Sequence, residues 1–119
     1  IEFTFVDKHN QVKFYNNTME RVFPRSPSII GRMVNKCHPP KSVHVVEEIV
    51  EEFRAGRKDE AKFWLETQGR YLVITYYALR NTSGNYLGVL ETTQDVTGIR
   101  SLNGEQRLLD WNKNEGNHN

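Results

Sequence analysis

The sequence contains a single cysteine, Cys37, so no disulfide bond can form within the chain. It also lacks a surplus of basic residues, because 16 Lys and Arg stand against 15 Asp and Glu, for a formal net charge of +1. No apolar run approaches the roughly 18 residues that a membrane-spanning helix requires. We therefore expect a cytoplasmic protein that binds neither nucleic acid nor a membrane.

Recognisable catalytic motifs are missing as well. We find no glycine-rich phosphate loop, no Ser-His-Asp set with supporting context and no pair of carboxylates arranged for acid–base chemistry. Four glutamates recur at i,i+4 spacing within residues 47–52, and we expect them to form a solvated helix face. The sequence therefore predicts a protein that is not an enzyme.

What is present is a pattern of short strands around one clear helix. Alternating polarity and a polar turn predict a hairpin, and apolar residues at three- and four-residue steps predict an amphipathic helix. The last three strands are joined by turns too short for parallel crossovers, so they form an antiparallel meander. The strands are expected over 2–6, 12–15, 61–67, 70–80 and 86–95, the helix over 41–55, and shorter helical turns over 18–23 and around 32–35. The fold class is α+β, a five-stranded antiparallel sheet with helices packed on one face.

The C-terminal end differs from the rest of the chain. Residues 101–111 carry apolar side chains at Leu102, Leu108, Leu109 and Trp111, which predict a final helix that Gly104 weakens. Residues 112–119 are polar and repeat asparagine, so we expect a disordered tail. Residues 1–100 would then form one domain. Because the chain starts at Ile1 without an initiator Met or a basic, apolar leader, we expect a piece of a longer protein with no signal peptide of its own.

Three short motifs appear in an ordered spacing: Phe-Val-Asp at 5–7, Val-Lys-Phe-Tyr-Asn at 12–16 and Gln-Asp-Val-Thr at 94–97. Together they resemble a PAS domain over residues 1–100. The segments 23–28, 30–32 and 37–44 resemble a bacterial subgroup in which the PAS domain follows a DUF438 region and a hemerythrin-like domain at the C-terminal end of a larger protein. The resemblance implies a pocket between helices and sheet, pairing with a second copy, association with these upstream domains and a sensory role, with no established ligand.

Cys37, His38 and His44 are the candidates for cofactor chemistry, because thiolate and imidazole groups bind haem and metal ions. The alternative is structural. Pro39 and Pro40 would stiffen the start of the helix, His38 would cap backbone groups and His44 would be solvated, since it points away from the apolar stripe of the helix. Cys37 could also act alone as a redox sensor. The cofactor is therefore unknown, with haem, another small molecule or none all open.

Aromatic side chains supply the candidates for an organic ligand pocket: Phe53, Phe63 and Tyr76. Neighbouring residues of a strand point to opposite faces, so only one of Tyr76 and Tyr77 can face the pocket, and the sequence leaves open which. The alternative is a filled core in which these side chains only pack the helix against the sheet.

The strand at 70–80 is apolar on both faces, although a sheet with helices on one side should have one wet face. Something should cover the second face, and the segment before residue 1, the 101–111 helix and a second copy are the candidates. We expect a homodimer through this sheet face. Asp95 and Thr97 would carry a signal out of the domain.

Three functions stay open on the sequence. The first is a sensory or regulatory module that binds a small ligand or cofactor, dimerises, or does both. The second is an interaction module with a filled core and no ligand. The third is a haem or metal redox module that uses Cys37 and His38.

Overall fold

The computed structural model describes residues 1–16, 30–31, 40–109 and 111, without the side chains of residues 40–42. A hairpin, one helix and a three-stranded meander follow one another along the chain. The elements are β1 (Glu2–Asp7), β2 (Val12–Tyr15), α1 (Pro40–Arg54), β3 (Glu60–Thr67), β4 (Arg70–Arg80) and β5 (Tyr86–Asp95). The predicted α+β fold with a five-stranded antiparallel sheet is confirmed, and each of these six elements begins and ends within one residue of its predicted limits.

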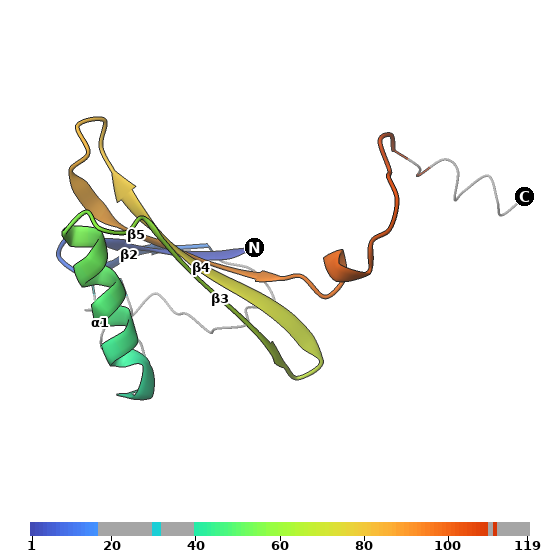
Figure 1. The fold of residues 1–119 in the computed structure, drawn as a ribbon, viewed down its shortest axis with the longest axis horizontal. Coiled ribbons are helices and arrows are strands. Elements are labelled where there is room, and N and C mark those ends of the chain that lie inside the picture. The colour runs from blue at the N-terminus through green and yellow to red at the C-terminus, as the bar shows by residue number, and fades with distance from the viewer. Residues whose placement is uncertain (17–29, 32–39, 110, 112–119) are drawn as a thin grey trace, which may run out of the picture.

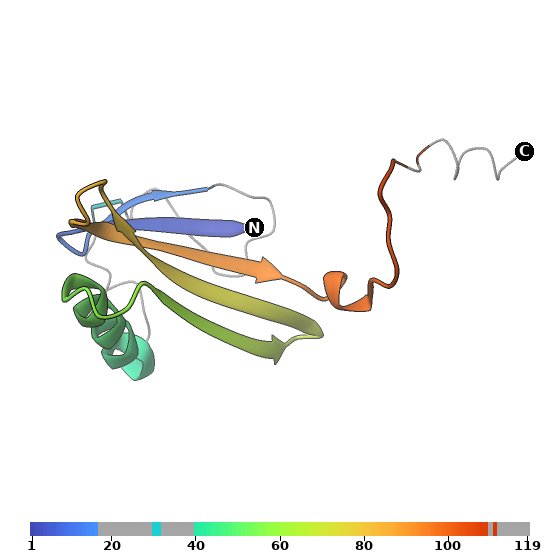
Figure 2. The same cartoon turned by 45° about the horizontal axis from the view of Figure 1, so that its top comes forward.

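The five strands form one sheet in the order β2-β1-β5-β4-β3, with every neighbouring pair antiparallel. The first strand β1 therefore lies beside the last strand β5 (Figures 1 and 2). The chain thus leaves the sheet from its central strand and not from an edge. A conformational change in the central strand β5 would therefore reach the segment after residue 95 directly along the backbone.

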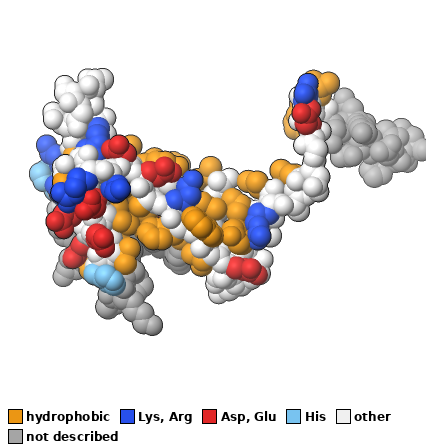
Figure 3. Space-filling model, in the orientation of Figure 1, with side chains coloured by type: hydrophobic (Ala, Val, Ile, Leu, Met, Phe, Trp, Pro, Cys, Tyr) orange, Lys and Arg blue, Asp and Glu red, His pale blue; other side chains and the backbone are white. Residues whose placement is uncertain are grey.

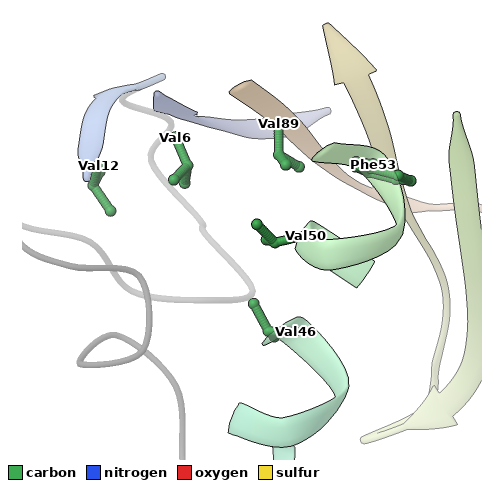
Figure 4. Close-up of a cluster of buried hydrophobic side chains, with 6 residues drawn as sticks. All are labelled: Val6, Val12, Val46, Val50, Phe53 and Val89. Carbon is green, nitrogen blue, oxygen red and sulfur yellow. The ribbon is translucent and has the colours of Figure 1, made fainter. Parts of the chain in front are cut away.

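Helix α1 packs on one face of the sheet because its apolar residues recur at helical spacing. Val46, Val50 and Phe53 are buried there, against Val6 and Val89 of the central strands (Figure 4). Gly56 follows the end of the helix: its φ is +75° and its N–H donates to the carbonyl of Phe53 at 3.1 Å, a left-handed C-terminal turn that favours glycine. Within the residues described, no helix is both long and apolar enough to cross a membrane.

The buried core fixes the two faces of the sheet, because successive strand residues point to opposite sides. We call the face under α1 the inner face and the opposite one the outer face. The register places these side chains on the outer face: Phe3, Phe5, Phe14, Trp64, Val73, Thr75, Tyr77, Leu79, Leu90 and Thr92. Tyr76 packs against the inner core, which answers the question that the sequence left open.

Gly88 marks the closest approach of β5 to β1. A Cβ atom at this position would overlap the backbone oxygen of Val6 and lie 2.9 Å from the ring of Phe5, and the φ angle is +151°. No other residue type fits this backbone without moving β1. The contact between the first and last strands therefore depends on this glycine.

The C-terminal segment differs from its prediction. Only Ile99–Ser101 forms a turn of 3-10 helix, and residues 102–109 are not helical. Gly104 adopts φ +66°, which interrupts a helix, and a short helix is marginal in water without a surface to pack on. The segment leads away from the sheet (Figure 1). The predicted helical turns at 18–23 and around 32–35 and the predicted tail at 112–119 lie outside the described residues.

Candidate functional site

A small cavity lies between α1 and the centre of the sheet. Its volume is about 10 Å³, and a water molecule needs roughly that much space. Its walls are Val6, Val46, Ile49, Val50, Tyr76, Val89 and Glu91. The cavity is apolar except at Glu91, so a ligand that enlarged it would meet a carboxylate at that end.

A larger hollow opens on the β3 side of the same helix. Its volume is about 510 Å³, and it is open to the surroundings. Pockets for small molecules generally span roughly 300–1,000 Å³, so the hollow has the size of a ligand site. It is lined by Val45, Glu48, Ile49, Glu52, Phe53, Lys58, Glu60, Ala61 and Phe63. Ile49 lines both spaces, so they lie next to each other along α1.

The hollow has an apolar floor and a charged rim. Glu52 at the rim accepts two hydrogen bonds from Arg57, from Nε at 2.8 Å and from Nη2 at 3.0 Å. These bonds lower the pKa of Glu52 and raise the pKa of Arg57. The pair therefore stays ionised, and Glu48 and Glu60 add further negative charge beside Lys58.

The structure brings together the three aromatic residues that the sequence proposed for a pocket. Phe53 is 1% exposed at the floor of the hollow, and Phe63 stands beside it. The ring of Phe63 meets the ring of Tyr76 edge-on, at a centroid distance of 6.0 Å and an angle of 87°. Phe63 and Tyr76 thus connect the hollow to the small cavity.

The proposed cofactor residues are placed differently. His44 is exposed on α1 and lines neither space. Cys37 and His38 lie outside the described residues. In the ranges that the structure describes, no three His, Cys, Asp or Glu side chains come together as a metal ion would need.

Two arginines hold the C-terminal end of α1, and sequence reasoning missed both. Arg80 of β4 donates from Nη2 to the carbonyl of Phe53 at 2.8 Å and from Nε to Asp59 at 3.0 Å. Arg54 donates from Nη2 to Asn10 Oδ1 at 2.7 Å and also reaches the carbonyl of Lys8, in the β1–β2 turn. These contacts span more than twenty residues of sequence, so no local pattern announces them. They fix one end of the helix over the sheet.

Tyr86 lies under the same end of α1. Its hydroxyl is buried with no hydrogen-bond partner, and burial raises its pKa. The guanidinium of Arg54 lies 5.1 Å from the centre of its ring, a cation–π contact. Tyr86 therefore acts as an apolar support for the clamped end of the helix.

A second feature missed by sequence reasoning is a polar strip on the inner face. Glu2 pairs across the strands with Thr93, and Thr4 pairs with Glu91. All four side chains are buried, and Glu91 borders the cavity. The sequence alternation could have revealed this strip, because Glu2 and Thr4 lie at every second position before Val6, and Glu91 and Thr93 at every second position after Val89.

The exit from the sheet is a compact hydrogen-bonded turn built on the two residues proposed for signalling. Asp95 Oδ1 accepts hydrogen bonds from the N–H and the hydroxyl of Thr97, at 3.0 and 2.6 Å. The hydroxyl of Thr97 in turn accepts from the N–H of Tyr71 at 2.8 Å. The bonds from Thr97 lower the pKa of Asp95. The turn joins the end of β5 to the start of β4.

Comparison with known proteins agrees with this architecture. A family model described as PAS domain matches residues 1–97. A crystal structure of a C-terminal domain from Streptococcus mutans has 36% identity to the chain and a TM-score of 0.80, and the match covers 86% of this chain and 80% of that one. No curated protein matches in sequence.

More distant structures share the fold. The PAS domain of histidine kinase ThkA has a TM-score of 0.60 at 18% identity, covering 80% of this chain and 100% of that one. A sensory box sensor histidine kinase from Vibrio cholerae has a TM-score of 0.62 at 14% identity, covering 81% of each chain. With a family model over residues 1–97, a five-stranded antiparallel sheet and a helix across its inner face, the chain belongs to the PAS domain family.

Proposed function

We propose that the chain is a sensory module that binds a small, mainly apolar molecule between α1 and the inner face of the sheet. The observation that carries the proposal is the hollow of about 510 Å³ beside β3, which shares Ile49 as a lining residue with the inner cavity. Its apolar floor suits a flat or aliphatic group, because ligand pockets are mostly apolar with a few polar groups that fix orientation. The acidic rim disfavours an anionic ligand.

The asymmetry of α1 suggests how binding would be transmitted. Arg54 and Arg80 hold its C-terminal end, whereas the hollow extends along the helix from Phe53 back to Val45. A ligand in the hollow would favour one packing of the helix on the sheet, and such differential binding shifts a conformational population. Val89 and Glu91 of β5 lie against the cavity, and β5 leads directly to Asp95 and Thr97.

The wider context supports a regulatory role. The similar domain from Streptococcus mutans is a C-terminal domain of its protein. The sequence resemblance suggests a DUF438 region and a hemerythrin-like domain upstream. The PAS module would then respond to a ligand and act on these domains of the same protein.

The outer face supports the expected homodimer. Trp64 is 63% exposed and Phe14 is 52% exposed, and exposed apolar patches of this kind mark contact surfaces. This observation also favours the second candidate function, an interaction module that pairs through the outer face and binds no ligand.

Binding of a neutral apolar dye, N-phenyl-1-naphthylamine, tests the pocket. We expect saturable 1:1 binding to the unmodified chain and a loss of about tenfold or more in Ile49→Trp, because the larger ring would fill the space on both sides of position 49. Glu51→Trp is the matched control, since Glu51 is exposed on the same helix and borders neither space. If the unmodified chain binds no dye, or if both variants bind as it does, the pocket proposal fails.

Two further measurements separate the alternatives. An absorption spectrum of freshly purified protein, expressed with haem precursor, would show a Soret band only if a haem module is correct. Hydrogen exchange at residues 94–100, with and without the dye, tests transmission. Equal hydrogen exchange with and without the dye would mean that binding does not change the conformation of residues 94–100, and the proposed transmission would be wrong.

A further inference from the structure

The segment after the sheet carries an unusual amount of exposed apolar surface. We call residues 102–109 together with Trp111 the arm. Its apolar side chains are Leu102, Leu108, Leu109 and Trp111, with 74%, 83%, 75% and 70% of their surface exposed. Single exposed leucines are common on protein surfaces, but three large apolar side chains within four residues, at Leu108, Leu109 and Trp111, are a concentration of the kind that marks an interaction site.

The geometry of the exit directs the arm away from its own sheet. Val96 donates its N–H to the carbonyl of Tyr71 at 2.8 Å, and Arg100 donates its N–H to the carbonyl of Val96 at 2.9 Å. The guanidinium of Arg100 stacks on the ring of Tyr71 at 3.8 Å from its centre. With its root held in this way, the arm rises beyond the end of β5 and leaves its own sheet uncovered (Figures 1 and 2).

The arm is suited to burial in a contact. Arg107 and Glu105 form an ion pair with each other at 2.7 Å, so the two charges of the arm compensate locally. Figure 3 shows hydrophobic side chains along the sheet and again at the far end of the arm, separated by a mainly polar stretch. The arm and the outer face do not contact each other within one chain, but the arm of one chain can contact the outer face of another.

We propose that the arm of one copy lies on the outer face of a second copy, and that the second copy returns the same contact. An exchange of this kind is isologous, because each chain supplies one arm and one face, and a two-fold axis closes the assembly. The inference rests on the proposed dimer at the outer face and names the segment that builds it.

The size of the surfaces fits this occupant. A buried aromatic side chain contributes roughly 150–250 Å², and each contact would combine Trp111 and three leucines of the arm with Trp64, Tyr77 and Phe14 of the face. Two such contacts reach the range of roughly 1,200–2,000 Å² that specific interfaces bury. One arm alone would fall short, which favours reciprocal exchange.

The test is a complementation experiment by sedimentation velocity on the full chain. The arm variant is Leu108→Glu with Leu109→Glu, and the face variant is Trp64→Glu. Each should raise the dimer dissociation constant about tenfold or more. Leu65→Glu is the matched control, because Leu65 neighbours Trp64 but points to the inner side, and this variant should dimerise like the unmodified chain.

Mixing the two variants gives the decisive result. The arm variant retains a good face and the face variant retains a good arm, so their mixture should form a heterodimer more stable than either homodimer. If only the face variant loses dimerisation, the dimer proposed above stands and the exchange is wrong. If neither variant changes the dissociation constant, or if the unmodified chain is monomeric, both proposals are overturned.

Discussion

The two faces of the sheet invert the usual relation between polarity and burial. On the inner face the polar residues Glu2, Thr4 and Glu91 are buried beside valines, whereas on the outer face Phe14 and Trp64 are exposed. Helix α1 explains part of this, since Glu91 lines the cavity beside Val46 and Val50 of the helix. The outer face carries exposed rings beside polar residues such as Lys62, and no described element covers it, which is the basis of the dimer that we propose.

The inner face also differs from the outer one in how well it is filled. The buried cluster around α1 consists of five valines and Phe53, and the cavity and the hollow lie beside it. The outer face carries rings that no described element covers, including the stack of Phe3 on Phe14 at 5.6 Å. The space for a ligand lies on the side with the helix, where Phe63 and Tyr76 line it.

The largest expected effect comes from replacing one ring on each face. Phe53→Ala should lower the free energy of unfolding by about 3–5 kcal/mol, because the side chain is buried and its loss leaves a cavity. Trp64→Ala should change it by less than about 1 kcal/mol, since surface substitutions usually have small effects. Urea unfolding of both variants, followed by circular dichroism at low protein concentration, measures the difference.

Equal losses in the free energy of unfolding for Phe53→Ala and Trp64→Ala would contradict the difference between the two faces. Equal losses would mean that the outer face is buried in the chain itself. A matched measurement at high protein concentration sharpens the result, because a dimer that buries Trp64 would make only the unmodified chain more stable as concentration rises.

A smaller effect is expected at the clamp that holds α1 over the inner face. Arg80→Met keeps much of the side-chain length but removes the bonds to Phe53 and Asp59. Hydrogen bonds to charged groups contribute roughly 1.5–3 kcal/mol, and a loss in this range is expected on thermal unfolding. Hydrogen exchange in α1 should increase from its C-terminal end.

Lys62→Met is the control for Arg80→Met. Lys62 also lies on a strand and pairs with Glu60 at 3.7 Å, but both side chains are half exposed, and exposed ion pairs contribute little. A loss as large as that of Arg80→Met would show that removal of any strand cation, and not the clamp, weakens the fold.

Most of the sheet could be predicted from the sequence because its signals are local. The alternation of polar and apolar residues predicted the strands, the short turns predicted their antiparallel order, and the helical spacing of apolar residues predicted α1. The choice between Tyr76 and Tyr77 could not be made, because two adjacent aromatic residues satisfy either phase of the alternation equally well.

The candidate site was only partly predictable. Phe53, Phe63 and Tyr76 were identified from their chemistry, but the arginine clamps and the strip around Glu91 depend on contacts between distant strands. The helix expected at 101–111 was wrong over residues 102–109 for a related reason. Its apolar residues have helical spacing, but a short amphipathic helix needs a surface to pack on, and within one described chain the arm meets none.

The smallest expected effect lies at the exit, where the two faces end. Hydrogen bonds from Thr97 lower the pKa of Asp95, so the ionised form is favoured in the folded state. The stability that this provides is present above the unfolded pKa of about 4 and is lost as the pH falls through the lower folded value. Asp95→Asn keeps the side-chain oxygen but removes the charge. The difference in urea midpoint between the unmodified chain and this variant should therefore shrink as the pH is lowered from 6 to 3, whereas a constant difference would show that the ionised carboxylate does not stabilise the turn.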